Sequence, residues 1–67
     1  MIELTINGEK KTVPPNLSIE ELLTLFQVRK DAVVVEHNLQ ILKREALAVT
    51  RISANDTVEI IRLVGGG

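Results

Sequence analysis

Side chains that could take part in catalysis are few in this chain. Its single histidine, His37, is the residue type best suited to act as a general base near neutral pH. However, Asn38 follows it in a predicted turn, and no serine or acid lies at a recognisable motif spacing. We therefore interpret His37 as a solvated turn residue. Cysteine is absent, which excludes a thiol nucleophile and a thiolate zinc site.

The remaining charged clusters have structural interpretations. Glu20 and Glu21 could suggest a pair of carboxylates for acid–base work, but adjacent residues of a helix do not face each other. We assign both to the capping of a predicted helix. The charged run at residues 43–45 is interpreted as a solvated loop. The sequence thus predicts no catalytic residues and no metal ligands, and we do not expect the chain to be an enzyme.

Three glycines, Gly65, Gly66 and Gly67, close the sequence directly after an apolar strand pattern. A backbone without Cβ atoms can enter a narrow channel and adopt φ values that are closed to other residues. We expect a folded domain at residues 1–64 and a flexible tail at residues 65–67.

The strand before the glycines has apolar residues on both faces. If Val58 and Ile60 point toward the core, then Ile61 and Leu63 must point away from it, because side chains alternate along a strand. An exposed apolar pair beside a tail is typical of a docking surface. We predict that Ile61, Leu63 and Val64 contact partners.

Composition bounds the possible functions. The chain has 67 residues, which is one small domain near the lower limit for an independent core. Eight basic and nine acidic residues give a net charge of −1, which argues against a nucleic-acid partner. No signal-peptide pattern and no apolar run of the roughly 20 residues that span a bilayer are visible. We expect a soluble, cytoplasmic protein with no membrane partner.

Local patterns predict the elements of the first half. Residues 2–6 alternate between apolar and polar, and Asn7-Gly8 is a strong hairpin signal that leads into a return strand at residues 9–13. In "LSIEELLTLFQ", Ser18 and Glu21 match a capping box. Apolar residues at helical spacing then predict a helix of about ten residues.

The second half is less regular. "AVVVEHN" predicts a buried strand, and residues 40–42 could return beside it. In "KREALAVTRIS" we expect a loop with one helical turn, and then a short edge strand near residues 50–52. A final strand is predicted at residues 57–64.

This order predicts an α+β protein with the β-grasp, or ubiquitin-like, fold. It would have a mixed sheet of about five strands and one main helix packed on one face. The alternative, a ferredoxin-like sandwich, needs a second full helix, and "KREALAV" is too short to form one.

The whole chain resembles the ThiS family of ubiquitin-like sulfur carriers, which serve thiazole formation in thiamin biosynthesis. The resemblance rests on "MIELTINGE", "LSIEELL", "VVVEHNLQIL" and "DTVEIIRLVGGG". It implies that Gly65, Gly66 and Gly67 enter the active sites of partners, where the carboxylate of Gly67 is adenylated and then converted to a thiocarboxylate. Many family members end in two glycines, whereas this chain ends in three.

The resemblance also implies partners. An adenylating enzyme of the ThiF, or ubiquitin-activating, type would consume ATP and Mg²⁺. A cysteine desulfurase system would supply the sulfur, and a thiazole synthase would receive it. The carrier itself would bind no cofactor and would be a monomer. Two alternatives remain open: a carrier for molybdopterin synthesis or a ubiquitin-like protein modifier, and a non-catalytic β-grasp binding module with an inert tail.

Overall fold

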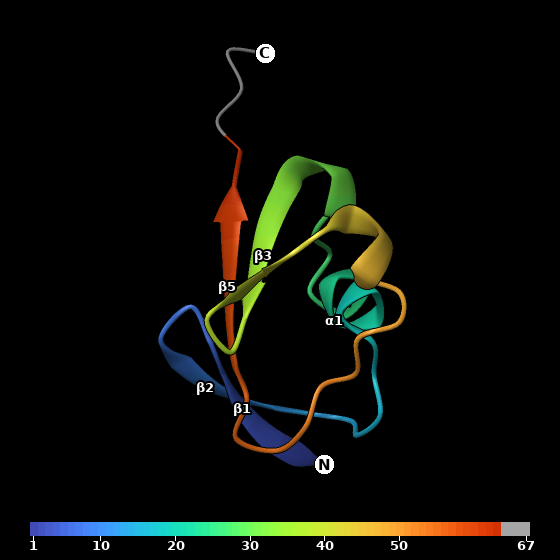
Figure 1. The fold of residues 1–67 in the computed structure, drawn as a ribbon. Coiled ribbons are helices and arrows are strands. Elements are labelled where there is room, and N and C mark those ends of the chain that lie inside the picture. The colour runs from blue at the N-terminus through green and yellow to red at the C-terminus, as the bar shows by residue number, and fades with distance from the viewer. Residues whose placement is uncertain (64–67) are drawn as a thin grey trace.

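Five strands form one mixed sheet in a computed structural model of the chain, which describes residues 1–63 (Figure 1). The strands are β1 (Ile2–Ile6), β2 (Glu9–Val13), β3 (Val33–His37), β4 (Gln40–Leu42) and β5 (Thr57–Arg62). Their spatial order is β2-β1-β5-β3-β4. The central pair, β1 and β5, is parallel, and the other neighbours are antiparallel.

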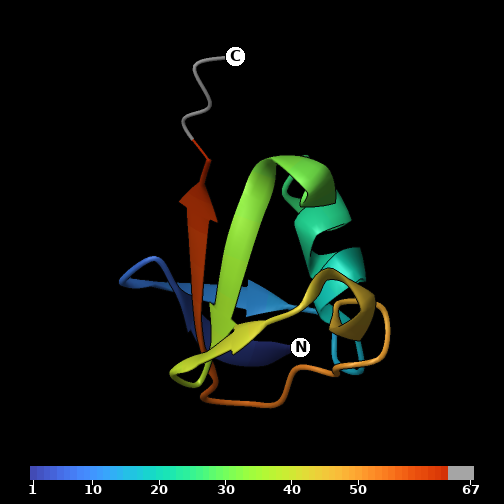
Figure 2. The ribbon, with the colours of Figure 1, turned by 45° about the horizontal axis from the view of Figure 1, so that its top comes forward.

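One α-helix, α1 (Ile19–Leu25), lies against one face of this sheet (Figure 2). Two short 3-10 turns, η1 (Lys30–Ala32) and η2 (Arg44–Ala46), complete the regular structure of residues 1–63. The predicted mixed sheet with one main helix is therefore confirmed.

The β1–β2 hairpin follows from its turn residues. Asn7 and Gly8 have φ values of 51° and 82°, as a two-residue turn between twisted antiparallel strands requires. The register places Ile6 opposite Glu9 and Ile2 opposite Val13.

Helix α1 begins at the predicted capping box. Ser18 Oγ accepts a hydrogen bond from the Glu21 N–H at 3.0 Å, and Glu21 Oε1 accepts one from the Ser18 N–H at 2.8 Å. The helix is 7 residues long, shorter than predicted. It ends because Gln27 adopts a left-handed φ of 60°. The N–H groups of Gln27 and Val28 then donate to the carbonyls of Thr24 and Leu23, as in a Schellman motif.

The core lies between α1 and the sheet. The helix contributes Ile19, Leu22 and Leu23, each at most 1% exposed. The other buried apolar residues come from four strands and from the segment between β4 and β5: Leu4, Ile6, Val13, Val33, Val35, Leu47, Ile52 and Val58.

The prediction of an edge strand at residues 50–52 was wrong. Arg51 makes one isolated bridge to Ser18 and does not extend the sheet. The Ile19 N–H donates to the Thr50 carbonyl, and the Ile52 N–H donates to the Leu17 carbonyl. The backbone of Thr50 and Ile52 therefore pairs with the residues around the N-terminus of α1, and the Ile52 side chain is buried in the core. The helical turn expected in this region is confirmed as η2.

Replacing Ser18 with alanine should lower the free energy of unfolding by about 1 kcal/mol, because the Glu21 N–H loses its acceptor. Urea denaturation measures this change. Ser53→Ala is the control, since Ser53 is exposed and its hydroxyl makes no hydrogen bond within the described part of the chain. Equal losses for the two variants would show that the cap does not stabilise the helix.

Candidate functional site

The exposed face of β5 is the first part of the candidate site. Val58 is fully buried and Ile60 is half-buried, whereas Ile61 and Leu63 are 50% and 56% exposed. The predicted alternation is confirmed. The predicted strand ends two residues early, at Arg62. Val64, Gly65, Gly66 and Gly67 lie outside the described residues, so their roles stay predictions, as does docking by Ile61 and Leu63.

This apolar face extends across two further strands. Ile61 pairs with Val34 of β3, and both alternate with residues that face the core. On β4, Ile41 is 70% exposed and lies on the same face, because it pairs with Glu36. We call Val34, Ile41, Ile61 and Leu63 the outer patch. Sequence reasoning missed Val34 and Ile41 because their positions depend on the strand register.

Strand β5 is held along both edges. It pairs with β3 from Val58 to Arg62. The Leu63 N–H continues this contact by donating to the Ala32 carbonyl at 3.0 Å. On the other edge, Asn7 Oδ1 accepts from the Ile60 N–H at 2.7 Å, just beyond the β1 ladder. The part of the outer patch formed by Ile61 and Leu63 is therefore held by backbone hydrogen bonds.

His37 is not the solvated turn residue that the sequence predicted. Its Nε2 lies 2.7 Å from Asp56 Oδ2, and the two side chains are 16% and 12% exposed. An ionised carboxylate can only accept, so Nε2 carries the hydrogen in this contact. The acid lies 19 residues away in sequence, and the antiparallel pairing of β3 with β5 brings it close.

Asp56 joins the β3–β4 turn to the start of β5. Its Oδ2 also accepts from the Ser53 N–H at 2.8 Å, and its Oδ1 accepts from Asn38 Nδ2 at 3.2 Å. Asn38 Oδ1 in turn accepts from the Thr57 N–H at 2.9 Å. We call Asp56 with His37, Asn38 and Ser53 the Asp56 clasp.

The electrostatics of the clasp favour an ionised Asp56. Burial acts to raise the pKa of Asp56, but hydrogen bonds from His37, the Ser53 N–H and Asn38 outweigh it. The pKa of Asp56 is therefore held below its ordinary value. Among residues 1–63, the Ser53 hydroxyl is not hydrogen-bonded to His37, so these two residues do not form a nucleophile–base pair. The contacts support a structural role for the clasp.

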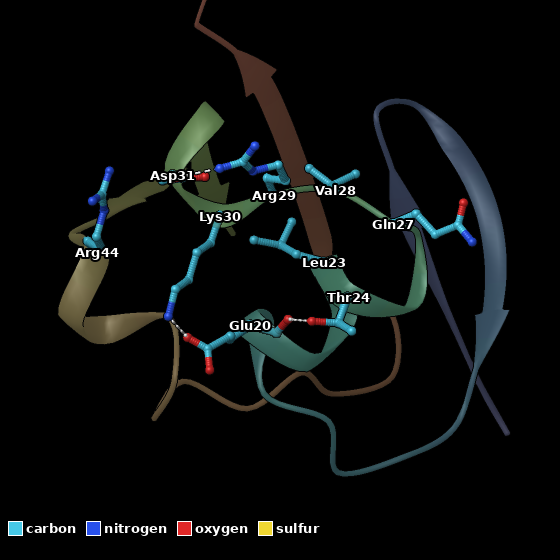
Figure 3. Close-up of a pocket in the computed structure, with 9 residues that line it drawn as sticks. All are labelled: Glu20, Leu23, Thr24, Gln27, Val28, Arg29, Lys30, Asp31 and Arg44. Atoms are coloured by element: carbon cyan, nitrogen blue, oxygen red, sulfur yellow. Dashed lines mark hydrogen bonds and ion pairs between the residues drawn. The ribbon is translucent and has the colours of Figure 1, made fainter.

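A groove lies between α1, η1 and Arg44 of η2, and no residue of β5 lines it (Figure 3). Two of its cations are paired with its own acids. Lys30 Nζ lies 2.7 Å from Glu20 Oε1, and an Arg29 guanidinium nitrogen lies 3.2 Å from Asp31 Oδ2. Glu20 therefore binds Lys30, and Glu21 alone closes the capping box that the sequence had assigned to both.

Two further findings concern residues 1–63. They contain no group of three or more His, Cys, Asp or Glu side chains placed to hold a metal ion. Within the same residues, no helix has both the length and the apolar composition needed to cross a membrane.

Comparison with protein families gives one match over almost the whole chain, to the ThiS family at residues 2–67. The sulfur carrier protein ThiS of Bacillus subtilis (strain 168) is 34% identical over 65 residues, which are 96% of this chain and 98% of that protein. A thiazole synthase of Paramagnetospirillum magneticum (strain ATCC 700264 / AMB-1) is 33% identical over 66 residues. The match covers 98% of this chain, which spans 20% of the length of that relative.

The structure is also similar to a solved one. The crystal structure of the thiamine biosynthesis protein ThiS from Geobacter metallireducens superposes with a TM-score of 0.84 at 38% sequence identity. The match covers 98% of this chain and 100% of that chain. The predicted β-grasp fold is confirmed by this likeness together with the mixed five-stranded sheet.

Replacing Asp56 with asparagine should destabilise the protein at pH 7 by about 1–3 kcal/mol, because three donors lose an ionised acceptor. The folded pKa lies below the unfolded value of about 3.9, so the stabilisation is present above that value and is lost as pH falls through the folded pKa. The difference between wild type and Asp56→Asn should therefore narrow below about pH 4.

Urea titrations at several pH values measure this difference. Asp31→Asn is the matched control, because Asp31 forms an exposed ion pair of the kind worth about 0–1 kcal/mol. A deficit for Asp56→Asn that stays constant from pH 7 to pH 3 would contradict the assignment of the clasp to an ionised Asp56.

Proposed function

The chain belongs to the ThiS family, and from this premise we propose that it carries sulfur as a thiocarboxylate on the carboxyl group of Gly67. The sulfur is destined for thiazole formation in thiamin biosynthesis. The observation that carries the proposal is the family match, which runs through the three glycines to residue 67.

The proposed chemistry starts from an unreactive group. An α-carboxyl has a pKa of about 3.5 and is ionised at pH 7, so it is a poor electrophile. A carboxylate oxygen of Gly67 attacks the α-phosphorus of ATP, and pyrophosphate leaves to give an acyl adenylate. A sulfur nucleophile then attacks the carbonyl carbon, and AMP leaves with the C–O bond electrons. With a persulfide as the nucleophile the product is an acyl disulfide, and a thiol then attacks its donor-side sulfur, which breaks the S–S bond, forms a new disulfide and releases the thiocarboxylate.

Partners supply the catalysis in this scheme. An adenylating enzyme of the ThiF type binds the ATP and Mg²⁺, and a cysteine desulfurase system provides the sulfur. Support for a thiazole synthase as acceptor comes from the Paramagnetospirillum relative. There, a region similar to this chain is part of a protein named thiazole synthase.

The outer patch and the glycine tail have separate roles in this proposal: the patch docks the partner, and the tail delivers the carboxylate. The outer patch on β3, β4 and β5 offers an apolar docking surface of the kind that protein partners cover. Four residues follow Leu63 in the sequence and can span up to about 14 Å when extended. That length would let the Gly67 carboxylate reach a buried active site while the folded domain stays docked.

Gly66→Val tests the threading of the tail. The variant should unfold at nearly the wild-type temperature, because Gly66 has no side chain to contribute to the core. Its adenylation should fall sharply, since a β-branched side chain restricts the backbone and blocks a narrow channel. Removing Gly67 should also slow the reaction, by roughly a hundredfold or more, because the carboxylate sits one residue short of its position.

The assay is ATP–pyrophosphate exchange with the cognate adenylating enzyme, followed by detection of the thiocarboxylate. Thr12→Val is the control, because it places the same residue type, valine, at an exposed position of β2 away from the tail. The carrier proposal would have to be abandoned if Gly66→Val were charged and delivered its sulfur as well as wild type.

Ile61→Ser and Leu63→Ser test the docking surface. Both side chains are at least half exposed, so each change should alter stability by about 0.5 kcal/mol or less. The kcat/KM of adenylation should nevertheless fall by roughly tenfold, because the partner loses an apolar anchor. Val49→Ser removes a more exposed apolar side chain, 74% exposed, outside the patch. An equal effect of Val49→Ser, or unfolding of either patch variant, would refute this assignment.

A further inference from the structure

Two carboxylates stand side by side within the outer patch. Glu36 of β3 and Glu59 of β5 are Cα partners in the antiparallel ladder. Both belong to the face that carries Val34 and Ile61, because these four residues alternate with core-facing ones. Directly opposed residues have Cβ atoms about 5 Å apart, and like charges in this arrangement destabilise a sheet.

Apolar side chains flank this acidic pair on two sides. On the β4 side, the partner of Glu36 is Ile41, and the neighbouring rung on this face is Val34 with Ile61. Neither carboxylate takes part in an ion pair among residues 1–63. The register places Lys10 on the same face, but it lies on β2, with β1 between it and β5.

A partner that covers the outer patch must therefore also cover the acidic pair. Taking two like charges out of water without a counter-charge is strongly unfavourable. A guanidinium offers several N–H donors in a planar fork and can bind two carboxylates at once. A second copy of this chain is a poor occupant, because a symmetric contact through the patch would gather four carboxylates.

We infer that the partner docked on the outer patch, which under the proposed function is the adenylating enzyme, places a cationic side chain, best an arginine, between Glu36 and Glu59. The acidic pair destabilises the free carrier slightly and is neutralised in the complex. It selects a basic apolar surface and disfavours association between copies of the carrier.

Replacing either glutamate with glutamine tests separately how the pair affects the stability of the free carrier and how it affects binding of the partner. Glu36→Gln and Glu59→Gln should each raise the urea midpoint of the isolated protein, because the like-charge repulsion is removed. The same variants should bind the adenylating enzyme roughly tenfold more weakly or worse, since the partner's cation is left without its full counter-charge. Glu3→Gln makes the same charge change at an exposed position of β1 and should alter neither quantity.

Glu36→Lys sharpens the test. It should raise the urea midpoint further, because the pair across β3 and β5 becomes oppositely charged. Its binding should be weaker than that of Glu36→Gln, since two cations would meet in the complex. A merely structural role for the pair would move stability and affinity in the same direction.

Calorimetry with the adenylating enzyme, together with sedimentation of the free carrier, gives the deciding results. Wild-type affinity in both glutamine variants, alongside normal adenylation, would overturn the inference and leave the proposed function standing. Self-association of wild type through the patch would also overturn it. Failure of wild type itself to bind or be adenylated would overturn the inference and the proposed function together.

Discussion

The pairing of β5 with β1 on one edge and β3 on the other is the constraint on which the rest of the structure depends. It directs Val58 into the core, fully buried, and leaves Ile61 half exposed on the opposite face. The Asp56 clasp fixes the start of the strand, and the Leu63–Ala32 hydrogen bond continues its pairing beyond Arg62. One strand thus supports the core and presents the surface proposed for partners.

Features that depend on neighbouring residues could be predicted from the sequence. The Asn7-Gly8 turn and the Ser18–Glu21 capping box are local, so residue type and spacing were sufficient. The end of α1 was missed because a glutamine, Gln27, adopts the left-handed conformation that usually signals itself by glycine. Gln27 itself is exposed, and the turn that it forms lets the next residue, Val28, pack against the core.

Contacts across the sheet could not be predicted, because they depend on register. The His37–Asp56 contact joins residues far apart in sequence, so His37 was wrongly interpreted as solvated. The opposition of Glu36 and Glu59 arises in the same way. The exposure of Ile61 and Leu63 was correctly predicted, since alternation along one strand needs no knowledge of its neighbours.

The central claim is that the Gly67 carboxylate carries sulfur, and intact-mass measurement of the protein isolated from cells tests it most directly. The account predicts a species heavier by the exchange of one oxygen for one sulfur, with the change on the peptide that ends at Gly67. This species should disappear from cells that lack the adenylating enzyme. An unmodified carboxyl terminus during active thiamin synthesis, or sulfur located elsewhere in the chain, would contradict the account.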